Sequence, residues 1–341
     1  MQIQIQSSVH RRPGGREPGL EELVGESPPF LAVLDRIPRL AETEAPVMIT
    51  GETGTGKELV ARALHDRSRR QGRAFVPLNC GALPEALVEN ELFGHARGAF
   101  TDATSQADGL LAEADGGTLF LDEVDSLGPG AQVKLLRFLQ SCEYRPLGSA
   151  RTRRADLRIL AATNADLPRL VAEQRFRQDL YYRLDVLRLS LPPLRHRPGD
   201  VALLAWRFLE RHAARHRRGA LRLSPGAVER LSAHTWPGNV RELEAVVQRA
   251  ALLCDGPVVQ AEDLDLPDGL AFPCALVEAA VAGSLRRRRE QAVELAERSC
   301  LLDALAAHAG NVTRAAQSVG KERRSFQRLL RKHAIDREVF A

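Results

Sequence analysis

The chain has 341 residues, of which 44% are hydrophobic and 27% charged, and its formal net charge is +4. This length predicts two or three domains. No run of about 18 apolar residues occurs, so we expect no membrane-spanning helix, and residues 1–20 lack the apolar segment of a secretory signal. The five cysteines are scattered without Cys-x-x-Cys spacing, which favours reduced thiols and a cytoplasmic location.

Charge is unevenly distributed along the chain. Residues 284–341 carry 13 Lys and Arg against 7 Asp and Glu, a net charge of +6. Subtracting these from the 48 and 44 of the whole chain leaves 35 against 37 in the remainder, a net charge of −2. A near-neutral body with a basic tail predicts a catalytic part followed by a nucleic-acid-binding part.

The first part of the chain predicts an α/β fold. A polar leader rich in Gly, Pro and Arg occupies residues 1–20. From residue 21 to residue 190, apolar runs of strand length alternate with segments of helix length, which is typical of a mainly parallel sheet with helices on both faces. Strands are predicted at Val47–Thr50, Phe75–Asn79, Gly117–Leu121, Arg158–Ala162 and Val186–Leu189.

Helical patterns dominate the rest of the chain. Residues 191–256 predict a small helical domain, and residues 257–290 are expected to be a linker before a third domain at 291–341. Ser224 is expected to cap a helix that has Pro225 in its first turn. The predicted helices are Asp200–His216, Ser224–His234, Asn239–Leu253, Ala292–His308, Val312–Val319 and Arg323–His333.

Residues 47–65 contain the clearest chemical motif, in which a strand candidate leads into Gly51–Lys57, GETGTGK, and helical spacing follows. Glycines let successive backbone N–H groups converge on one anion, and the helix N-terminus adds its positive dipole end. The pattern predicts a phosphate-binding loop with Lys57 on the outer phosphates. A flexible glycine turn is the alternative, but only four of the 48 basic residues are lysine, which argues against a chance match. Glu58 stands where a Ser or Thr usually binds Mg²⁺, so the metal is expected to need another acid.

Two carboxylates meet that need. The strand pattern at Gly117–Leu121 ends in Asp122 and Glu123, and parallel sheets bind ligands at the carboxyl ends of their strands. Asp122 is expected to hold Mg²⁺ and Glu123 to polarise the water that attacks the γ-phosphate. The alternative is an acid cluster at the start of a helix over residues 124–127. Asn164 ends the next strand candidate, where it orients the attacking water, senses the γ-phosphate or is an ordinary strand-end Asn.

Together these motifs resemble the AAA+ domain of bacterial enhancer-binding proteins, the activators of sigma-54 RNA polymerase. The similarity extends over about residues 20–266. It is carried by LVGESP at 23–28, GETGTGKE at 51–58, LNCGAL at 78–83, ELFGHARGAFTDA at 91–103, GTLFLDE at 117–123, AATN at 161–164, FRQDLYYRL at 176–184 and WPGNVRELE at 236–244. The resemblance implies a AAA+ P-loop NTPase with a parallel-sheet subdomain at 21–190 and a helical lid at 191–256. Family loops also carry Glu after the lysine, so Glu58 fits the family.

The resemblance implies ATP and Mg²⁺ as cofactors. It assigns nucleotide binding to Val24, Gly25, Gly51, Glu52, Thr53, Gly54, Thr55, Gly56, Lys57, Glu58 and Arg241, the last as the second sensor. It implies that Asp122 holds Mg²⁺ and that Glu123 activates water. Asn79 is implied to hold Glu123 inactive until the nucleotide state is right, and Asn164 matches the first sensor.

Arg177 and Arg183, six residues apart, would by themselves be a solvated helix face in an arginine-rich chain. The resemblance instead implies that both are arginine fingers, which project into the site of a neighbouring subunit. Fingers in trans require a ring, and the family forms hexamers. A finger arginine contributes about 10³–10⁵ in rate in phosphoryl transfer.

Residues 98–103 correspond to the GAFTGA loop with which the family contacts sigma-54. They are Gly98, Ala99, Phe100, Thr101, Asp102 and Ala103. Asp102 replaces the second glycine of the family pattern and adds a charge and a Cβ atom to the turn. We expect contact through Phe100 and Thr101 to persist, whereas the strength or regulation of sigma-54 engagement is open.

The basic tail resembles the Fis-type domain that ends many of these activators. GNVTRAAQSVG followed by RRSFQRLLRKH fits a helix-turn-helix with its recognition helix in the major groove. A three-helix bundle with a solvated basic face is the alternative. The DNA-contact candidates are Arg323, Arg324, Ser325, Gln327, Arg328 and Arg331. Arg286–Arg289 either adds phosphate contacts or is a solvated linker.

These expectations combine into an ATP-driven transcription activator. The tail would bind upstream DNA, the ring would hydrolyse ATP, and the loop at residues 98–103 would remodel the closed complex of sigma-54 polymerase to an open one. One alternative is a DNA-binding regulator of the same fold that has lost sigma-54 engagement because of Asp102, and another is a remodeller of a different protein. Since only about 20 residues precede the ATPase, we expect no N-terminal regulatory domain and control by a partner protein, by abundance or by a segment outside this sequence.

Overall fold

The computed structural model describes residues 23–99, 105–266, 312–318, 326 and 330. The chain divides into two compact units, residues 1–266 and residues 267–341. The first unit contains a parallel sheet with its helices and a helical lid.

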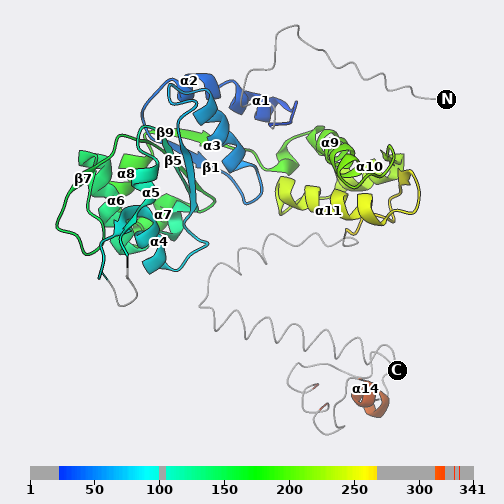
Figure 1. The fold of residues 1–341 in the computed structure, drawn as a ribbon. Coiled ribbons are helices and arrows are strands. Elements are labelled where there is room, and N and C mark those ends of the chain that lie inside the picture. The colour runs from blue at the N-terminus through cyan, green and yellow to red at the C-terminus, as the bar shows by residue number, and fades with distance from the viewer. Residues whose placement is uncertain (1–22, 100–104, 267–311, 319–325, 327–329, 331–341) are drawn as a thin grey trace. The chain divides into compact units, whose positions relative to one another are not determined.

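Five parallel strands form the central sheet in the order β2–β5–β8–β1–β9 (Figure 1). They are β1 (Val47–Thr50), β2 (Phe75–Asn79), β5 (Thr118–Asp122), β8 (Arg158–Thr163) and β9 (Leu187–Ser190). In β1, Val47 lies opposite Leu160 of β8 and Leu187 of β9. All five predicted strands are confirmed, each within one residue at either end, because a strand buried on both faces is a nearly continuous apolar run.

Alternate side chains of the strands enter two separate cores, as the twofold periodicity of a strand requires. Val47 and Ile49 pack on one face with the first three helices, whereas Met48 packs on the opposite face. The first three helices are α1 (Pro28–Leu34), α2 (Ile37–Ala41) and α3 (Lys57–Asp66). The other face is covered by α4 (Glu85–Phe93), α5 (Leu110–Glu113), α6 (Pro129–Ser141), α7 (Leu167–Ala172) and α8 (Gln178–Leu184).

Short elements complete this part of the unit. The two-residue strands pair antiparallel as β3 (Gly94–His95) with β4 (Ala107–Asp108) and β6 (Glu143–Tyr144) with β7 (Arg153–Arg154). A single 3₁₀ turn, η1 (Val124–Ser126), follows β5. Two-residue pairings carry little sequence signal, and none of these strands was predicted.

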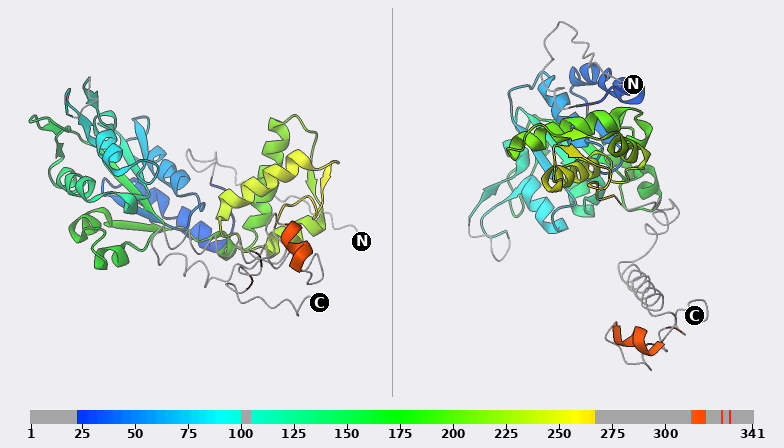
Figure 2. Two further views of the ribbon diagram at one scale, coloured as in Figure 1. Left: turned by 90° about the horizontal axis from the view of Figure 1, so that it is seen from below. Right: turned by 90° about the vertical axis from the view of Figure 1, so that its right-hand side faces the viewer.

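The helical lid has its own core around the fully buried Trp236, whose indole N–H donates to the carbonyl oxygen of Leu231 at 2.9 Å. Figures 1 and 2 show its helices gathered apart from the sheet. Its elements are η2 (Leu194–His196), α9 (Asp200–Arg215), β10 (Arg222–Leu223), α10 (Pro225–Ala233), α11 (Asn239–Leu253) and β11 (Val258–Val259). The three predicted lid helices are confirmed, and Ser224 caps α10 by accepting from the N–H of Ala227 at 3.2 Å.

In the second unit the structure describes α14 (Val312–Ser318), which matches the helix predicted at 312–319. Val312 and Ala316 of α14 are buried, as are Phe326 and Leu330, two helical residues four positions apart. The predicted helix Ala292–His308, and Arg323–His333 apart from those two residues, lie outside the described residues.

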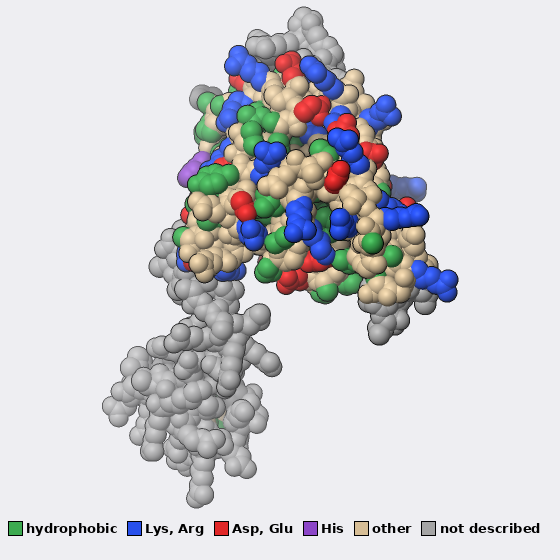
Figure 3. Space-filling view, turned by 90° about the vertical axis from the view of Figure 1, so that its left-hand side faces the viewer, with side chains coloured by type: hydrophobic (Ala, Val, Ile, Leu, Met, Phe, Trp, Pro, Cys, Tyr) green, Lys and Arg blue, Asp and Glu red, His purple; other side chains and the backbone are tan. Residues whose placement is uncertain are grey.

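Basic and acidic side chains alternate over the described part of the face shown in Figure 3, instead of gathering by sign. This face of the first unit therefore carries charges of both signs, unlike the sequence of residues 284–341, in which basic residues predominate. Across the described residues, every helix is too short or too polar to cross a bilayer.

Candidate functional site

The loop between β1 and α3 has a backbone that depends on glycine. Gly54 and Gly56 have φ angles of 78° and 97°, in the left-handed region that L side chains rarely adopt. A Cβ atom on Gly54 would also lie 2.2 Å from the carbonyl oxygen of Gly238 in the lid. The ten-residue helix α3 begins at Lys57, directly behind the loop, so its positive dipole end and free N–H groups face the loop.

Lys57 lies folded against this loop. Its Nζ donates to the carbonyl oxygens of Gly51 at 2.8 Å and Glu52 at 3.2 Å. Burial lowers the pKa of the Lys57 ammonium from its ordinary value, and the nearby charges of Asp122 and Glu123 oppose that shift. A partly desolvated cation held by two neutral carbonyl groups gains when an anion replaces them.

A cavity of about 490 Å³ opens in front of Lys57. Residues from β2, β5, α3 and α11 line it, together with Asn164 directly after β8, so the carboxyl ends of three neighbouring strands meet the loop and the lid there. Of the predicted nucleotide-site residues, it brings together Thr53, Gly54, Gly56, Lys57, Glu58, Asn79, Asp122, Glu123, Asn164 and Arg241.

The two carboxylates take up distinct positions at the end of β5. One Asp122 carboxylate oxygen accepts the backbone N–H of Glu123 at 3.0 Å. Glu123 has a φ of 51°, a strained backbone for a non-glycine residue, which costs about 1–3 kcal/mol and is often found at active sites. Its carboxylate lies so close to Gly81 that a Cβ atom there would be 2.1 Å from Glu123 Oε2. A single 3₁₀ turn, η1, follows with Glu123 at its N-cap, so the acid pair also stands at the start of a helical turn, as the alternative expected.

Two amide side chains border the same cavity. The side-chain oxygen of Asn79 accepts from the N–H groups of Gly81 at 2.8 Å and Ala82 at 3.0 Å. No hydrogen bond joins Asn79 to Glu123 among the described residues, so the control of Glu123 by Asn79 stays a prediction. Asn164 Nδ2 donates to Thr53 Oγ1 at 2.9 Å, which connects the end of β8 to the glycine-rich loop.

A second cavity of about 740 Å³ adjoins the first, since Gly56, Leu59, Val240 and Glu244 line both. Its apolar lining suits an aromatic base more than a phosphate chain, and comes from Leu23, Val24, Phe30, Leu59, Leu204, Phe208 and Val240. The predicted residue Val24 lines this cavity, and its role in nucleotide binding stays a prediction. Gly25 supports this wall, because a Cβ atom there would lie 2.4–2.6 Å from Phe30, Arg197 and Asp200.

Sequence reasoning missed several residues of the two cavities. Val240 and Glu244 flank the predicted Arg241 on α11, and their spacing of four residues places them on one helix face. That spacing within WPGNVRELE was a usable signal. The contributions from α1 and α9, such as Phe30 and Phe208, had no comparable signal because they depend on how the lid packs.

The candidate finger arginines lie elsewhere. Arg177 directly precedes α8, and its guanidinium forms two bonds to the Asp179 carboxylate, at 3.1 and 2.8 Å. Arg183, on the same helix, donates from two nitrogens to the carbonyl oxygen of Leu139 at 3.3 Å. Neither residue lines the two cavities of its own chain.

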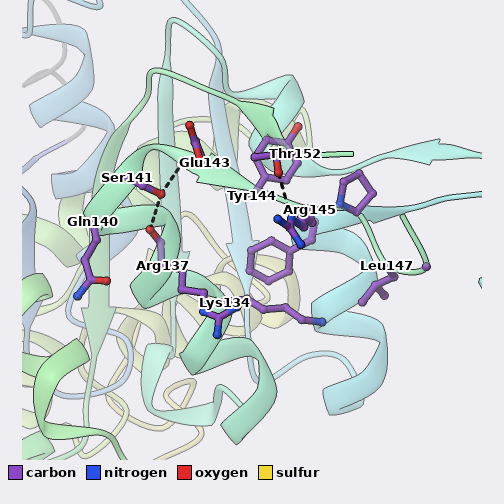
Figure 4. A pocket seen from close by; sticks show the side chains of 12 residues that line it. Lys134, Arg137, Gln140, Ser141, Glu143, Tyr144, Arg145, Leu147 and Thr152 are labelled. Atoms are coloured by element: carbon purple, nitrogen blue, oxygen red, sulfur yellow. Dashed lines mark hydrogen bonds between the residues drawn. The ribbon is translucent and has the colours of Figure 1, made fainter. Parts of the chain in front are cut away.

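A separate cavity of about 490 Å³ lies between α6 and the β6–β7 pair (Figure 4). Leu147 in its wall donates to the carbonyl oxygen of Gly94 at 2.8 Å and accepts from the N–H of Ala96 at 2.9 Å. These bonds hold the segment that leads into residues 98–103. Of the predicted sigma-54 contacts, Gly98 and Ala99 are described, whereas Phe100, Thr101, Asp102 and Ala103 lie outside the described residues. The same holds for the DNA-contact candidates Arg323, Arg324, Ser325, Gln327, Arg328 and Arg331.

The sheet order, the glycine-rich loop behind β1 and the helical lid over it define a AAA+ P-loop NTPase. The chain matches three family models: the sigma-54 interaction domain over residues 23–190, the AAA+ ATPase lid domain over residues 195–268, and the bacterial regulatory protein, Fis family, over residues 292–333. The chain belongs to the family of sigma-54-dependent transcriptional regulators, with an ATPase domain and a C-terminal Fis-type helix-turn-helix.

Individual relatives agree with this assignment. The chain is 45% identical to the nitric oxide reductase transcription regulator NorR1 of Cupriavidus necator, over 96% of this chain and 67% of that protein. It is 46% identical to the response regulator protein PilR of Pseudomonas aeruginosa, over 96% of this chain and 73% of that protein. The crystal structure of NtrX from Brucella abortus in complex with ADP is similar with a TM-score of 0.68 and 34% identity, over 92% of this chain and 69% of that one. The chain thus spans about two thirds of these relatives.

Proposed function

We propose that this regulator hydrolyses ATP in the cavity between the glycine-rich loop and the lid, and uses the energy to open promoter complexes of sigma-54 RNA polymerase. One observation carries the proposal: Lys57, Asp122, Glu123 and Arg241 line one cavity, although they come from three separate stretches of the chain. The apolar cavity beside it provides room for the base. The NtrX complex with ADP supports nucleotide binding in a relative.

Magnesium fits the residues at this site. Mg²⁺ is bound through one or two carboxylates together with substrate phosphates, so a single protein acid is sufficient. We assign this role to Asp122, which ends β5 and lines the same cavity as Lys57. When bound, Mg²⁺ would neutralise charge on the phosphate oxygens. Lys57 and the loop N–H groups would hold the phosphates, with Val24, Gly25, Gly51, Glu52, Thr53, Gly54, Thr55, Gly56 and Glu58 shaping the loop and its surroundings.

Glu123 is the proposed general base for the attacking water. Its left-handed backbone turns the residue away from the strand direction at the end of β5. Accepting the proton of the attacking water contributes about 10²–10⁴ in rate. Asn164, bonded to Thr53, is proposed to sense the γ-phosphate, and Asn79 to restrain Glu123 in the wrong nucleotide state.

Assembly into a ring is proposed from the position of the two candidate finger arginines. Since Arg177 and Arg183 line neither cavity of their own chain, we assign them to the site of a neighbouring subunit in a hexameric ring. The domain limits proposed for each subunit are 1–20 for the leader, 21–190 and 191–256 for the ATPase, 257–290 for the linker and 291–341 for DNA binding. The DNA-binding domain would hold the ring at upstream sites in the cytoplasm, under control of a partner protein, of abundance or of a segment outside this sequence.

A second function has one observation in its favour. Asp102 stands where the GAFTGA pattern has glycine, so the chain is alternatively a DNA-binding AAA+ regulator with lost or altered sigma-54 engagement. Open-complex formation with sigma-54 polymerase separates the two functions, and DNA binding that works without ATP hydrolysis would favour the second.

Hydrolysis is tested with three variants of the purified protein. Lys57→Ala is expected to abolish ATP binding, because it removes the cation that faces the phosphates. Glu123→Gln is expected to keep ATP binding and to lower kcat by about 10²–10⁴. Glu113→Gln makes the same change on an exposed residue of α5 and should leave kcat unaltered. Equal kcat values for Glu123→Gln and the wild type would refute the assignment of Glu123.

A further inference from the structure

Asn239, the first residue of α11, is fully buried and has a left-handed φ of 53°. Its side-chain oxygen accepts the N–H of Leu194 at 2.7 Å, and its Nδ2 donates to the carbonyl oxygen of Thr53 at 3.0 Å and to Glu52 Oε2 at 3.1 Å. The Asn239 side chain thus forms hydrogen bonds to one backbone group of the lid and to two groups of the phosphate-binding loop. A buried amide satisfied in this way holds its neighbours in one geometry, because each unmade bond would leave a buried polar group without a partner.

Glu52 faces the lid as well. Arg195 of η2 donates to both of its carboxylate oxygens, from Nη1 at 2.8 Å and from Nη2 at 2.5 Å. The bond from Arg195 lowers the pKa of Glu52, so the carboxylate stays charged at neutral pH. Glu52 lines neither of the two adjoining cavities. The Glu52 carboxylate therefore binds Arg195 of the lid, although Glu52 belongs to the glycine-rich loop.

A third contact completes the connection. The N–H of Val240 donates to the carbonyl oxygen of Gly54 at 3.0 Å. Gly54 and Gly238 approach so closely that no Cβ atom fits between them. Three consecutive loop residues, 52, 53 and 54, are thus each bonded to the N-terminal end of α11 or to η2. Val240 and Arg241 follow Asn239 directly and line the nucleotide cavity.

We infer that Glu52, Arg195 and Asn239 form a latch between the phosphate-binding loop and the lid, in which Glu52 is a positioning residue and not a nucleotide ligand. The latch fixes the start of α11 relative to the loop, and so places Val240 and Arg241 in the cavity before ATP arrives. Pre-organised groups bind more tightly because less freedom is lost on binding. This inference rests on the proposed ATP site.

A double-mutant cycle separates the latch from direct binding. Glu52→Gln and Arg195→Gln each remove one charge of the pair, and both side chains are about 40% exposed, so folding should be retained. Each single variant is expected to raise the Kd for Mg·ATP about 5-fold to 10-fold, and the double variant no more than either one. The kcat at saturating ATP should stay within about 3-fold of wild type, because Lys57, Asp122 and Glu123 lie outside the pair. Arg195→Lys should recover part of the affinity, since it restores the charge but not the two-pronged geometry.

Asn239→Asp provides an independent variant. It keeps the shape and the tolerance of left-handed φ, but turns a donor into an acceptor that faces the carbonyl of Thr53 and the carboxylate of Glu52. We expect at least a 10-fold rise in the Kd for Mg·ATP, measured by titration calorimetry. Asn90→Asp is the control, because the partly buried Asn90 of α4 lines neither cavity, and its side-chain oxygen keeps its bond to His95 as a carboxylate.

The outcomes are distinguishable. Non-additive losses in the cycle support the latch. If the Kd increases of the two single variants multiply in the double variant, or if kcat falls at unchanged Kd, the latch is refuted. Glu52 would then take part directly in binding or chemistry. If the wild-type protein itself binds no ATP, the proposed function fails, and the inference fails with it.

Discussion

Cys80 follows β2 directly and lies in the core beneath the site carboxylates. It is 1% exposed, and its N–H donates to the carbonyl oxygen of Asp122 at 2.9 Å. Burial, reinforced by the charge of Asp122, raises the pKa of the Cys80 thiol to about 12. The thiol is thus a small apolar filler beside a charged site, and its chemistry is suppressed by its surroundings.

This environment makes a prediction for thiol reactivity. At pH 8 the folded protein should alkylate at the exposed Cys142 at least about 100-fold faster than at Cys80, because only the thiolate reacts. Peptide mass spectrometry measures both rates, and in urea they should become equal. Since the folded thiol keeps its proton in the window from about pH 9 to about pH 12 while the unfolded one loses it, stability should fall as pH rises through that window. Comparable rates in the folded protein would contradict the buried position.

At the scale of elements, the α10 cap offers a separable test. Ser224→Ala removes the acceptor for the N–H of Ala227 and should destabilise α10 by about 1 kcal/mol. Ser232→Ala, on the same helix, removes only an exposed bond to the carbonyl oxygen of Val228 and should change stability by less than about 0.5 kcal/mol. Amide hydrogen exchange along α10 measures both effects. Equal exchange in the two variants would show that the cap does not hold the helix.

The elements also show what the sequence could predict. Buried parallel strands and amphipathic helices have local signals, so β1 and α11 were predicted with their observed bounds. Lys57, Asp122 and Glu123 could be brought together from sequence because β1 and β5 end at the same edge of one sheet.

The residues that the lid contributes to the site had a weaker signal in the sequence. Arg195 and Glu52 are 143 positions apart, and no periodicity relates them. The assignment of Glu52 to nucleotide binding stays a prediction, whereas the bonds from Arg195 to its carboxylate had no sequence signal, because the packing of the lid on the loop is a tertiary property. The short strands β6 and β7 were missed for the same reason, since each has two residues and depends on its partner.

At the scale of the whole molecule, the ring model predicts complementation between inactive variants. Lys57→Ala and Arg183→Ala should each lack ATPase activity alone. Mixed in equal amounts, they should regain up to about one quarter of wild-type activity, because a quarter of interfaces then pair an intact Lys57 with an intact neighbouring Arg183. Mixing Lys57→Ala with Asp122→Ala is the control, since both changes disable the same half of the site. An inactive first mixture would contradict fingers in trans.

The central claim is that ATP hydrolysis at this site opens sigma-54 promoter complexes. The most direct measurement is open-complex formation by the purified protein with sigma-54 polymerase and ATP, on a promoter that carries its upstream site. We predict open complexes with the wild type and none with Glu123→Gln, which would also show that Asp102 is tolerated. Robust ATP hydrolysis without open complexes would contradict the claim, and recovery in Asp102→Gly would identify Asp102 as the cause.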